Sequence, residues 1–184
     1  MESLQGTFLL ATNEMQDPRF VKSVIFICFH EAGDGAMGLV VNQPLTDVDM
    51  YDVLHDFNQD LDVTSLPPVY YGGPVEMESA FILHSDDYIS VQSRQVMEQV
   101  YLSQDPGLLV DVAHGKGPAH YLLALGYTGW GPGQLEQELC GAGWLSLPAR
   151  AGDLFLLAAP DMWEKVAARY GIDMHIYRDI QGTA

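Results

Sequence analysis

Short apolar runs, each bounded by glycine, proline or polar residues, recur along most of the chain. Runs rich in Val, Ile, Leu and Phe are typical of buried β-strands. The segment 31–38 contains three glycines and an aspartate, so it is predicted to be the loop of a β-hairpin. The pattern predicts strands over residues 7–12, 23–30, 39–42, 69–71, 80–84, 88–93, 120–125, 144–147 and 153–157.

Apolar residues at helical spacing mark the other elements, and Gly171 is expected to end the last helix. Helices and strands do not alternate regularly, so the pattern favours an α+β fold over a doubly wound parallel sheet. No repeat or long polar linker divides the chain, and we expect a single domain over residues 1–184. The predicted helices are residues 49–57, 105–114, 134–140 and 160–170.

The charge balance disfavours one class of function. Asp and Glu number 25 against 8 Lys and Arg, which gives a formal net charge of -17 at pH 7. Nucleic-acid affinity rests largely on basic side chains that release counterions from phosphates, so direct nucleic-acid binding is disfavoured. We expect the isolated protein to bind DNA weakly and without sequence preference at physiological salt. An anisotropy titration with labelled duplexes tests this, and tight, sequence-dependent binding would contradict it.

Several sequence features favour a cytoplasmic location without a membrane span. No Lys or Arg precedes Arg19, so the start lacks the basic region of a secretory signal peptide. No apolar run approaches the length of a membrane-spanning helix. Cys28 and Cys140 are the only cysteines and form no C-x-x-C pair, which indicates free thiols.

Few residues offer catalytic or metal chemistry. Cys28 and His30 face the same side of a strand, but a metal site needs two more ligands and the other histidines are scattered. Cys28 is a poor nucleophile because apolar surroundings raise the pKa of a thiol. Glu136 and Glu138 lie two apart on a helix, which points their carboxylates to different faces. We therefore expect no catalytic residue, metal or cofactor.

One long motif and three further segments resemble a known family. The motif is GYTGWGPGQLEQEL at residues 126–139, and the segments cover residues 9–28, 35–45 and 70–75. In this order they resemble the AlgH/YqgE family of bacterial proteins. The resemblance implies a mixed, largely antiparallel sheet curled toward a barrel, with helices packed outside. It names no reaction, because the family has no established biochemical activity, although its members are often labelled transcriptional regulators.

The resemblance and the residue types together give candidate ligand or partner residues. Arg19 lies in a DPRF turn typical of the family, where it would bind an anion or pin the turn to the sheet through a bidentate pair with a carboxylate; we favour the pair. Asn42 and the Gly72-Gly73 turn are ambiguous, since glycine admits close backbone approach for packing or for a ligand. The candidates are Arg19, Asn42, Gly72, Gly73, Trp130, Gln134 and Glu136.

The signature helix, residues 134–140, is predicted to pack on the sheet through large apolar side chains. Glu138 is expected to be a solvated helix charge. Three glycines are expected to let the helix approach closely, namely Gly126, Gly129 and Gly133. The side chains expected to be buried are Trp130, Leu135, Leu139 and Trp144.

Two classes of function remain open. We favour an interaction or regulatory protein that acts through a protein partner, because this role needs no basic recognition surface. The alternative is an enzyme or small-ligand binder with a pocket lined by Arg19, Asn42, Trp130 and Gln134. A common cleft for these four side chains would favour the alternative, and their dispersal would favour the first class. The sequence does not determine the oligomeric state.

Overall fold

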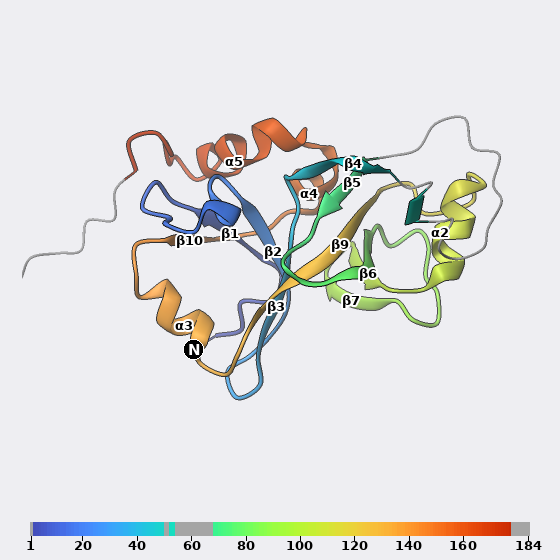
Figure 1. The fold of residues 1–184 in the computed structure, drawn as a ribbon, viewed down its shortest axis with the longest axis horizontal. Coiled ribbons are helices and arrows are strands. Elements are labelled where there is room, and N and C mark those ends of the chain that lie inside the picture. The colour runs from blue at the N-terminus through green and yellow to red at the C-terminus, as the bar shows by residue number, and fades with distance from the viewer. Residues whose placement is uncertain (1, 50–51, 54–67, 178–184) are drawn as a thin grey trace, which may run out of the picture.

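The computed structural model describes residues 2–49, 52–53 and 68–177 (Figure 1). The strands are β1 (Thr7–Ala11), β2 (Val24–Glu31), β3 (Gly35–Val40), β4 (Pro44–Asp49), β5 (Pro68–Tyr71), β6 (Val75–His84), β7 (Arg94–Met97), β8 (Val100–Ser103), β9 (Tyr121–Trp130) and β10 (Trp144–Pro148). The helices are the 3-10 turn η1 (Pro18–Phe20), α2 (Pro106–Ala113), α3 (Gln134–Leu139), α4 (Ala151–Leu156) and α5 (Ala159–Ala168).

The strands form one largely antiparallel sheet that curves into a half-barrel. Its main path runs β10, β1, β2, β3, β9, β6, β8 and β7. β4 pairs with β5, and β5 runs parallel to β9, so that β3, β5 and β6 all pair with β9. The predicted α+β class and the largely antiparallel, curled sheet are confirmed.

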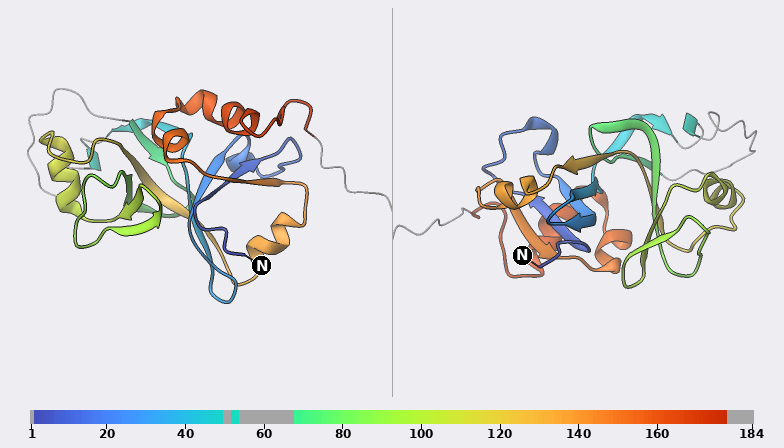
Figure 2. Two further views of the ribbon diagram at one scale, coloured as in Figure 1. Left: turned by 180° about the vertical axis from the view of Figure 1, so that it is seen from behind. Right: turned by 90° about the horizontal axis from the view of Figure 1, so that it is seen from below.

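Helices cover both faces of the sheet and create separate cores. α4 and α5 lie together over one core, whereas α3 and α2 lie at opposite ends of the molecule over two others (Figures 1 and 2). β2 shows why its sequence reads as a continuous apolar run. Val24 and Phe26 belong to the core under α5, while Ile25 and Ile27 belong to the core next to α3, so both faces of this strand are buried.

β3 corrects the predicted hairpin loop. Residues 35–38 are strand rather than loop, and only residues 32–34 connect β2 to β3. A Cβ on Gly35 would lie 2.2 Å from the carbonyl oxygen of Trp130, and a Cβ on Gly38 would lie 2.7 Å from the Ile25 side chain. These glycines therefore serve close packing against neighbouring strands.

β9 also runs further than predicted, continuing through Gly126 to Trp130. Gly126 has a left-handed φ of 71°, and the pairing of β9 with β6 shifts register at this point. Such a bulge changes which face the following residues occupy. Ala124 and Tyr127 consequently both contact the core under α5. Gly126 redirects the end of the strand instead of terminating it.

Two predicted strands are wrong. Residues 153–156 belong to α4, where buried Asp153 pairs with Arg169, the residue that follows α5, at an Oδ1 to Nε distance of 2.6 Å. This apolar run is too short for its periodicity to separate a helix from a strand. Residues 88–93 contain no strand, and β7 and β8 follow them.

The remaining predictions divide between confirmed elements and one segment outside the described residues. β1, β2, β5, β10, α2, α3 and α5 agree with their predicted positions to within a few residues, and Gly171 follows α5 with a φ of 73°. The predicted strand 80–84 is the second half of β6, and β4, β7 and β8 were not predicted. The predicted helix 49–57 lies outside the described residues apart from residue 49, which ends β4, and residues 52–53, which are helical. No helix in the described ranges is long and apolar enough to cross a membrane.

Candidate functional site

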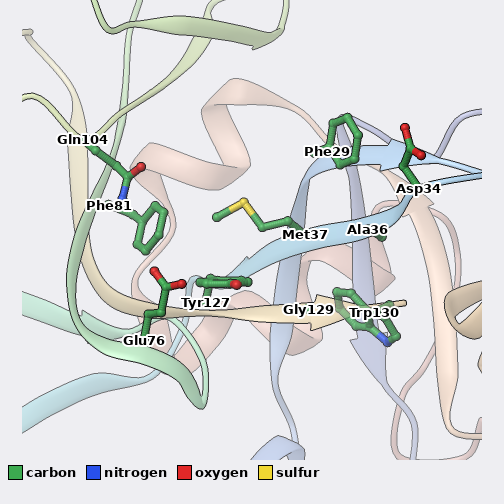
Figure 3. Close-up of a pocket in the computed structure, with 10 residues that line it drawn as sticks. All are labelled: Phe29, Asp34, Ala36, Met37, Glu76, Phe81, Gln104, Tyr127, Gly129 and Trp130. Carbon is green, nitrogen blue, oxygen red and sulfur yellow. The ribbon is translucent and has the colours of Figure 1, made fainter. Parts of the chain in front are cut away.

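A cleft of about 530 Å³ opens between β3, β6 and the end of β9 (Figure 3). We call it the aromatic cleft. The topology brings its walls together from the first, second and last thirds of the chain. It is lined by Phe29, Asp34, Ala36, Met37, Glu76, Phe81, Gln104, Tyr127, Gly129 and Trp130.

Aromatic rings form much of the wall of this cleft. Phe81 and Tyr127 meet edge to face, with ring centroids 5.7 Å apart. The guanidinium carbon of Arg94 lies 5.3 Å from the ring centroid of Phe29. An aromatic face attracts a cation through its quadrupole. One ring that lines the cleft, Phe29, thus already carries a cation of its own chain, although Arg94 does not itself line the cleft.

Two exposed carboxylates belong to the rim of the aromatic cleft. Asp34 lies in the turn between β2 and β3, and Glu76 lies where β6 deviates from regular pairing with β9. Figure 3 places Glu76 beside Tyr127 and Phe81, and Asp34 at the other end of the cleft near Phe29. Glu76 has a φ of 49°, an uncommon backbone conformation for a residue with a side chain. The Glu76 carboxylate is therefore placed at the cleft by an uncommon backbone conformation.

A second cleft, of about 330 Å³, lies beside α3, and we call it the tryptophan cleft. Thr128 lines this cleft but not the aromatic cleft, Tyr127 lines the aromatic cleft but not this one, and Gly129 and Trp130 line both. Successive side chains of a strand point to opposite faces, so the two clefts lie on the two faces of β9. The tryptophan cleft is lined by Met15, Asp17, Arg19, Phe20, Pro74, Val75, Thr128, Gly129, Trp130, Gln134, Glu138 and Trp144.

Glu138 fixes both tryptophans of this cleft, which corrects the expectation that it is a solvated charge. Its Oε2 accepts hydrogen bonds from the indole Nε1 of Trp130 at 2.9 Å and of Trp144 at 3.2 Å. Its Oε1 accepts from Nε2 of Gln134 at 2.9 Å. The predicted burial of Trp130, Leu135 and Trp144 is confirmed, and Leu139 is partly buried in the same core.

The predicted role of the three glycines in helix packing is wrong. A Cβ on Gly126 would lie 2.4 Å from the carbonyl oxygen of Gly73, not against α3. Gly129 borders the Tyr127 ring, and Gly133 has no neighbour within 4 Å of its Cβ position. Gly133 instead adopts a left-handed φ of 72° as the N-cap residue of α3. Gly126 thus gives room for the segment at Gly73 that crosses β9. Gly133 supplies the left-handed turn before α3.

Arg19 lines the tryptophan cleft but is paired within its own turn. Its Nε lies 3.0 Å from Oδ1 of Asp17, and its Nη2 lies 2.6 Å from Oδ2. The Arg19 guanidinium and backbone N–H hold the pKa of the Asp17 carboxyl below its usual range. The favoured bidentate pair therefore exists, although it closes the turn on itself rather than joining it to the sheet.

Three other candidates hold the backbone in place. Asn42 accepts a hydrogen bond from the Val24 N–H at 2.8 Å and donates to the Lys22 carbonyl at 2.9 Å, and it does not line the tryptophan cleft. Gly72 and Gly73 lie where the chain crosses β9. A Cβ on Gly72 would lie 2.2 Å from the Gly126 carbonyl oxygen, and one on Gly73 would lie 2.2 Å from the Tyr127 carbonyl carbon.

Glu136 and His30 form a second contact between α3 and the sheet. Nε2 of His30 lies 3.1 Å from Oε1 of Glu136, while Nδ1 of His30 accepts a hydrogen bond from the Leu4 N–H. The pKa of Glu136 is lowered, first by its own backbone N–H at the start of α3 and further by His30. Glu136 lines neither cleft.

Cys28 lies in a setting that opposes nucleophilic chemistry. Its thiol is buried in β2 and contacts the carbonyl oxygen of Phe26, and burial raises the pKa of this thiol far above its usual range. Cys140 is exposed at the end of α3. Across residues 2–49, 52–53 and 68–177, no three His, Cys, Asp or Glu side chains form a group that could hold a metal ion.

The tryptophan cleft brings together three of the four residues predicted to share a pocket, namely Arg19, Trp130 and Gln134. The carboxylates of the aromatic cleft were missed. Asp34 stands in a glycine-rich segment and Glu76 in a short acidic one, and neither pattern differs from an ordinary solvated turn. Only the alternation in the GYTGW stretch could have indicated that Tyr127 and Trp130 occupy opposite faces of a strand.

A half-barrel of mixed topology, with a glycine bulge in β9 and a short helix held by Glu138, defines the class of fold. The AlgH-like family model matches residues 8–175, and the chain belongs to this family. The resemblance to AlgH/YqgE proteins is therefore confirmed. The family model and the relatives below define no biochemical reaction.

Relatives and solved structures agree with this assignment. The chain is 40% identical over 178 residues to a UPF0301 protein of Thioalkalivibrio sulfidiphilus, covering 96% of this chain and 95% of the relative. It is 36% identical over 192 residues to a UPF0301 protein of Agrobacterium fabrum, covering 99% and 94%. The solution structure of the AlgH protein from Pseudomonas aeruginosa superposes with a TM-score of 0.79 at 33% identity, covering 99% and 96%. A Corynebacterium diphtheriae protein, with a TM-score of 0.72 at 22% identity over 92% and 88%, shares the fold alone.

Proposed function

We propose that this protein is an interaction protein that binds a basic segment of a partner protein in the aromatic cleft. The observation that supports this function is the combination of aromatic walls with two exposed carboxylates, Asp34 and Glu76. A lysine or arginine side chain satisfies both features, because its charge pairs with the carboxylates and its cationic head stacks on the rings. A neutral or anionic segment would gain neither contact.

The charge of the whole chain supports the same partner. A formal net charge of -17 attracts a basic partner over long range and raises the rate of encounter. Arg94 on Phe29 supplies an internal example of a cation on an aromatic ring of this cleft. A regulatory role would then act through the bound protein in the cytoplasm, without direct contact between this chain and DNA.

The test is a binding titration with a defined basic probe, the capped hexapeptide Lys-Val-Lys-Val-Lys-Val, whose valines favour an extended backbone. We expect saturable binding that a double variant, Asp34→Asn with Glu76→Gln, weakens by about tenfold, since two charge-assisted contacts are lost. Isothermal titration calorimetry gives the affinity, and NMR shift changes at Tyr127 and Phe81 locate the site.

A matched control separates the cleft from general charge attraction. The double variant Asp86→Asn with Glu98→Gln removes two exposed carboxylates that lie outside both clefts. It removes the same two negative charges as the cleft variant and is expected to bind like the unaltered protein. Equal weakening in both double variants, or no saturable binding of the probe, would contradict the proposed function.

A small-ligand function is the second candidate, because Arg19, Trp130 and Gln134 meet in the tryptophan cleft. Its weakness is that Asp17 already occupies the guanidinium, so an anionic ligand would have to displace this carboxylate. Thermal unfolding in the presence of inorganic phosphate or acetate tests it. Stabilisation that disappears in Arg19→Gln would favour this candidate.

A further inference from the structure

β9 loses one of its two neighbours before it ends. β6 pairs with β9 as far as Tyr127, which lies opposite Val75. β3 pairs with the next residues, Thr128 to Trp130, on the other edge. Within the described residues, no strand pairs with β9 beyond Tyr127 on the edge that β6 leaves. Figure 3 shows β3 alongside the end of β9 and β6 turning away from it.

The backbone of Gly129 faces this open edge. The carbonyl oxygen of Trp130 points toward β3, because it would lie 2.2 Å from a Cβ on Gly35. The N–H and C=O groups of successive strand residues point to opposite edges. The N–H and C=O of Gly129 therefore point away from β3. Gly129 is exposed, whereas Thr128 and Trp130 on either side are buried.

The open edge lies between the two clefts. Gly129 and Trp130 line both of them. A strand laid against this edge would point alternate side chains to opposite faces of the sheet. One set would enter the aromatic cleft, with its carboxylates, and the other would enter the tryptophan cleft, beside Phe20 and Trp144. A strand that fits both clefts would therefore alternate basic side chains, for the aromatic cleft, with apolar side chains, for the tryptophan cleft.

We propose that the partner segment binds as an added β-strand on the open edge of β9 at Gly129, with basic residues in the aromatic cleft and apolar residues in the tryptophan cleft. This inference rests on the proposed function and specifies its geometry. Main-chain hydrogen bonds to Gly129 supply affinity, and the two clefts supply specificity for the alternating pattern. Charge complementarity selects the occupant, because Asp34 and Glu76 stand beside the positions of the basic side chains.

The experiment uses two isomers of the same hexapeptide, bound to the unaltered full chain. One isomer is N-methylated on the three lysines and the other on the three valines, so charge and composition are identical. N-methylation blocks hydrogen bonding on one edge of an extended peptide, and the two isomers block opposite edges. We expect one isomer to bind like the parent peptide and the other to bind about tenfold or more weakly.

A second measurement follows hydrogen exchange at the protein backbone. The Gly129 amide is expected to exchange its hydrogen more slowly when the parent peptide is bound, and NMR of the labelled protein follows this residue. Equal affinity of the two isomers, equal weakening of both, or unchanged exchange at Gly129 would overturn strand addition. If the Asp34→Asn, Glu76→Gln variant nevertheless weakens binding, only the strand geometry fails. If it has no effect, the proposed function fails as well.

Discussion

Replacing Leu135 by alanine is expected to lower the free energy of unfolding by about 2 to 5 kcal/mol, the usual cost of truncating a fully buried aliphatic side chain. Leu135 is 1% exposed and packs in the core shared by β1, β2, β3 and the two tryptophans. Deleting its side chain removes apolar burial and leaves a cavity that the surrounding strands fill only partly. Urea denaturation followed by circular dichroism measures the change.

Leu156→Ala is the matched control for this substitution. Leu156 also lies on a short helix, α4, but it is 67% exposed. The same chemical change is therefore expected to alter the free energy of unfolding by no more than about 0.5 kcal/mol. A similar, small effect of both substitutions would show that α3 does not depend on the core beneath it.

Replacing Glu138 by alanine is expected to destabilise the protein by about 2 to 6 kcal/mol, since each of the two buried donors left unpaired costs roughly 1 to 3 kcal/mol. The indole N–H groups of Trp130 and Trp144 would both lose their acceptor, and these side chains are only 6% and 9% exposed. Denaturant titrations measure the loss, and the tryptophan fluorescence of the folded variant reports the changed indole environment.

Two further substitutions on α3 separate the role of Glu138 from helix propensity. Glu138→Gln keeps an amide oxygen as an acceptor but loses the charge, so its cost is expected to be about 1 kcal/mol. Gln137→Ala, at an exposed position of the same helix, is expected to change stability by no more than about 0.5 kcal/mol. A Glu138→Ala variant as stable as Gln137→Ala would mean that the indole groups do not depend on this carboxylate.

The open edge of β9 also bears on self-association. Unpaired strand edges invite pairing with other chains, and proteins commonly limit this with charged residues or short edges. This edge is short, and Asp34 and Glu76 lie in the cleft beside it. A second acidic copy of the chain is therefore disfavoured as an occupant, whereas a basic strand is favoured.

The sequence by itself determined the elements whose cause is local. β1 and β2 follow from apolar, β-branched and aromatic runs, and α5 follows from helical periodicity closed by Gly171. The burial of Leu135 follows from the apolar face of a short helix beside two tryptophans. Patterns within a few residues specify each of these elements. Their irregular order along the chain then indicates the α+β class.

The tertiary structure alone decided the elements and contacts that depend on distant neighbours. Gly35 and Gly126 look like turn residues in the sequence, but they lie within strands, where a neighbouring strand excludes a Cβ or a bulge requires a left-handed residue. Glu138 reads as a surface charge until two indole N–H groups from separate strands meet at its carboxylate. Asp34 and Glu76 share a cleft only because β3 and β6 both pair with β9. Strand pairing joins residues at any separation along the chain, so no local pattern encodes these contacts.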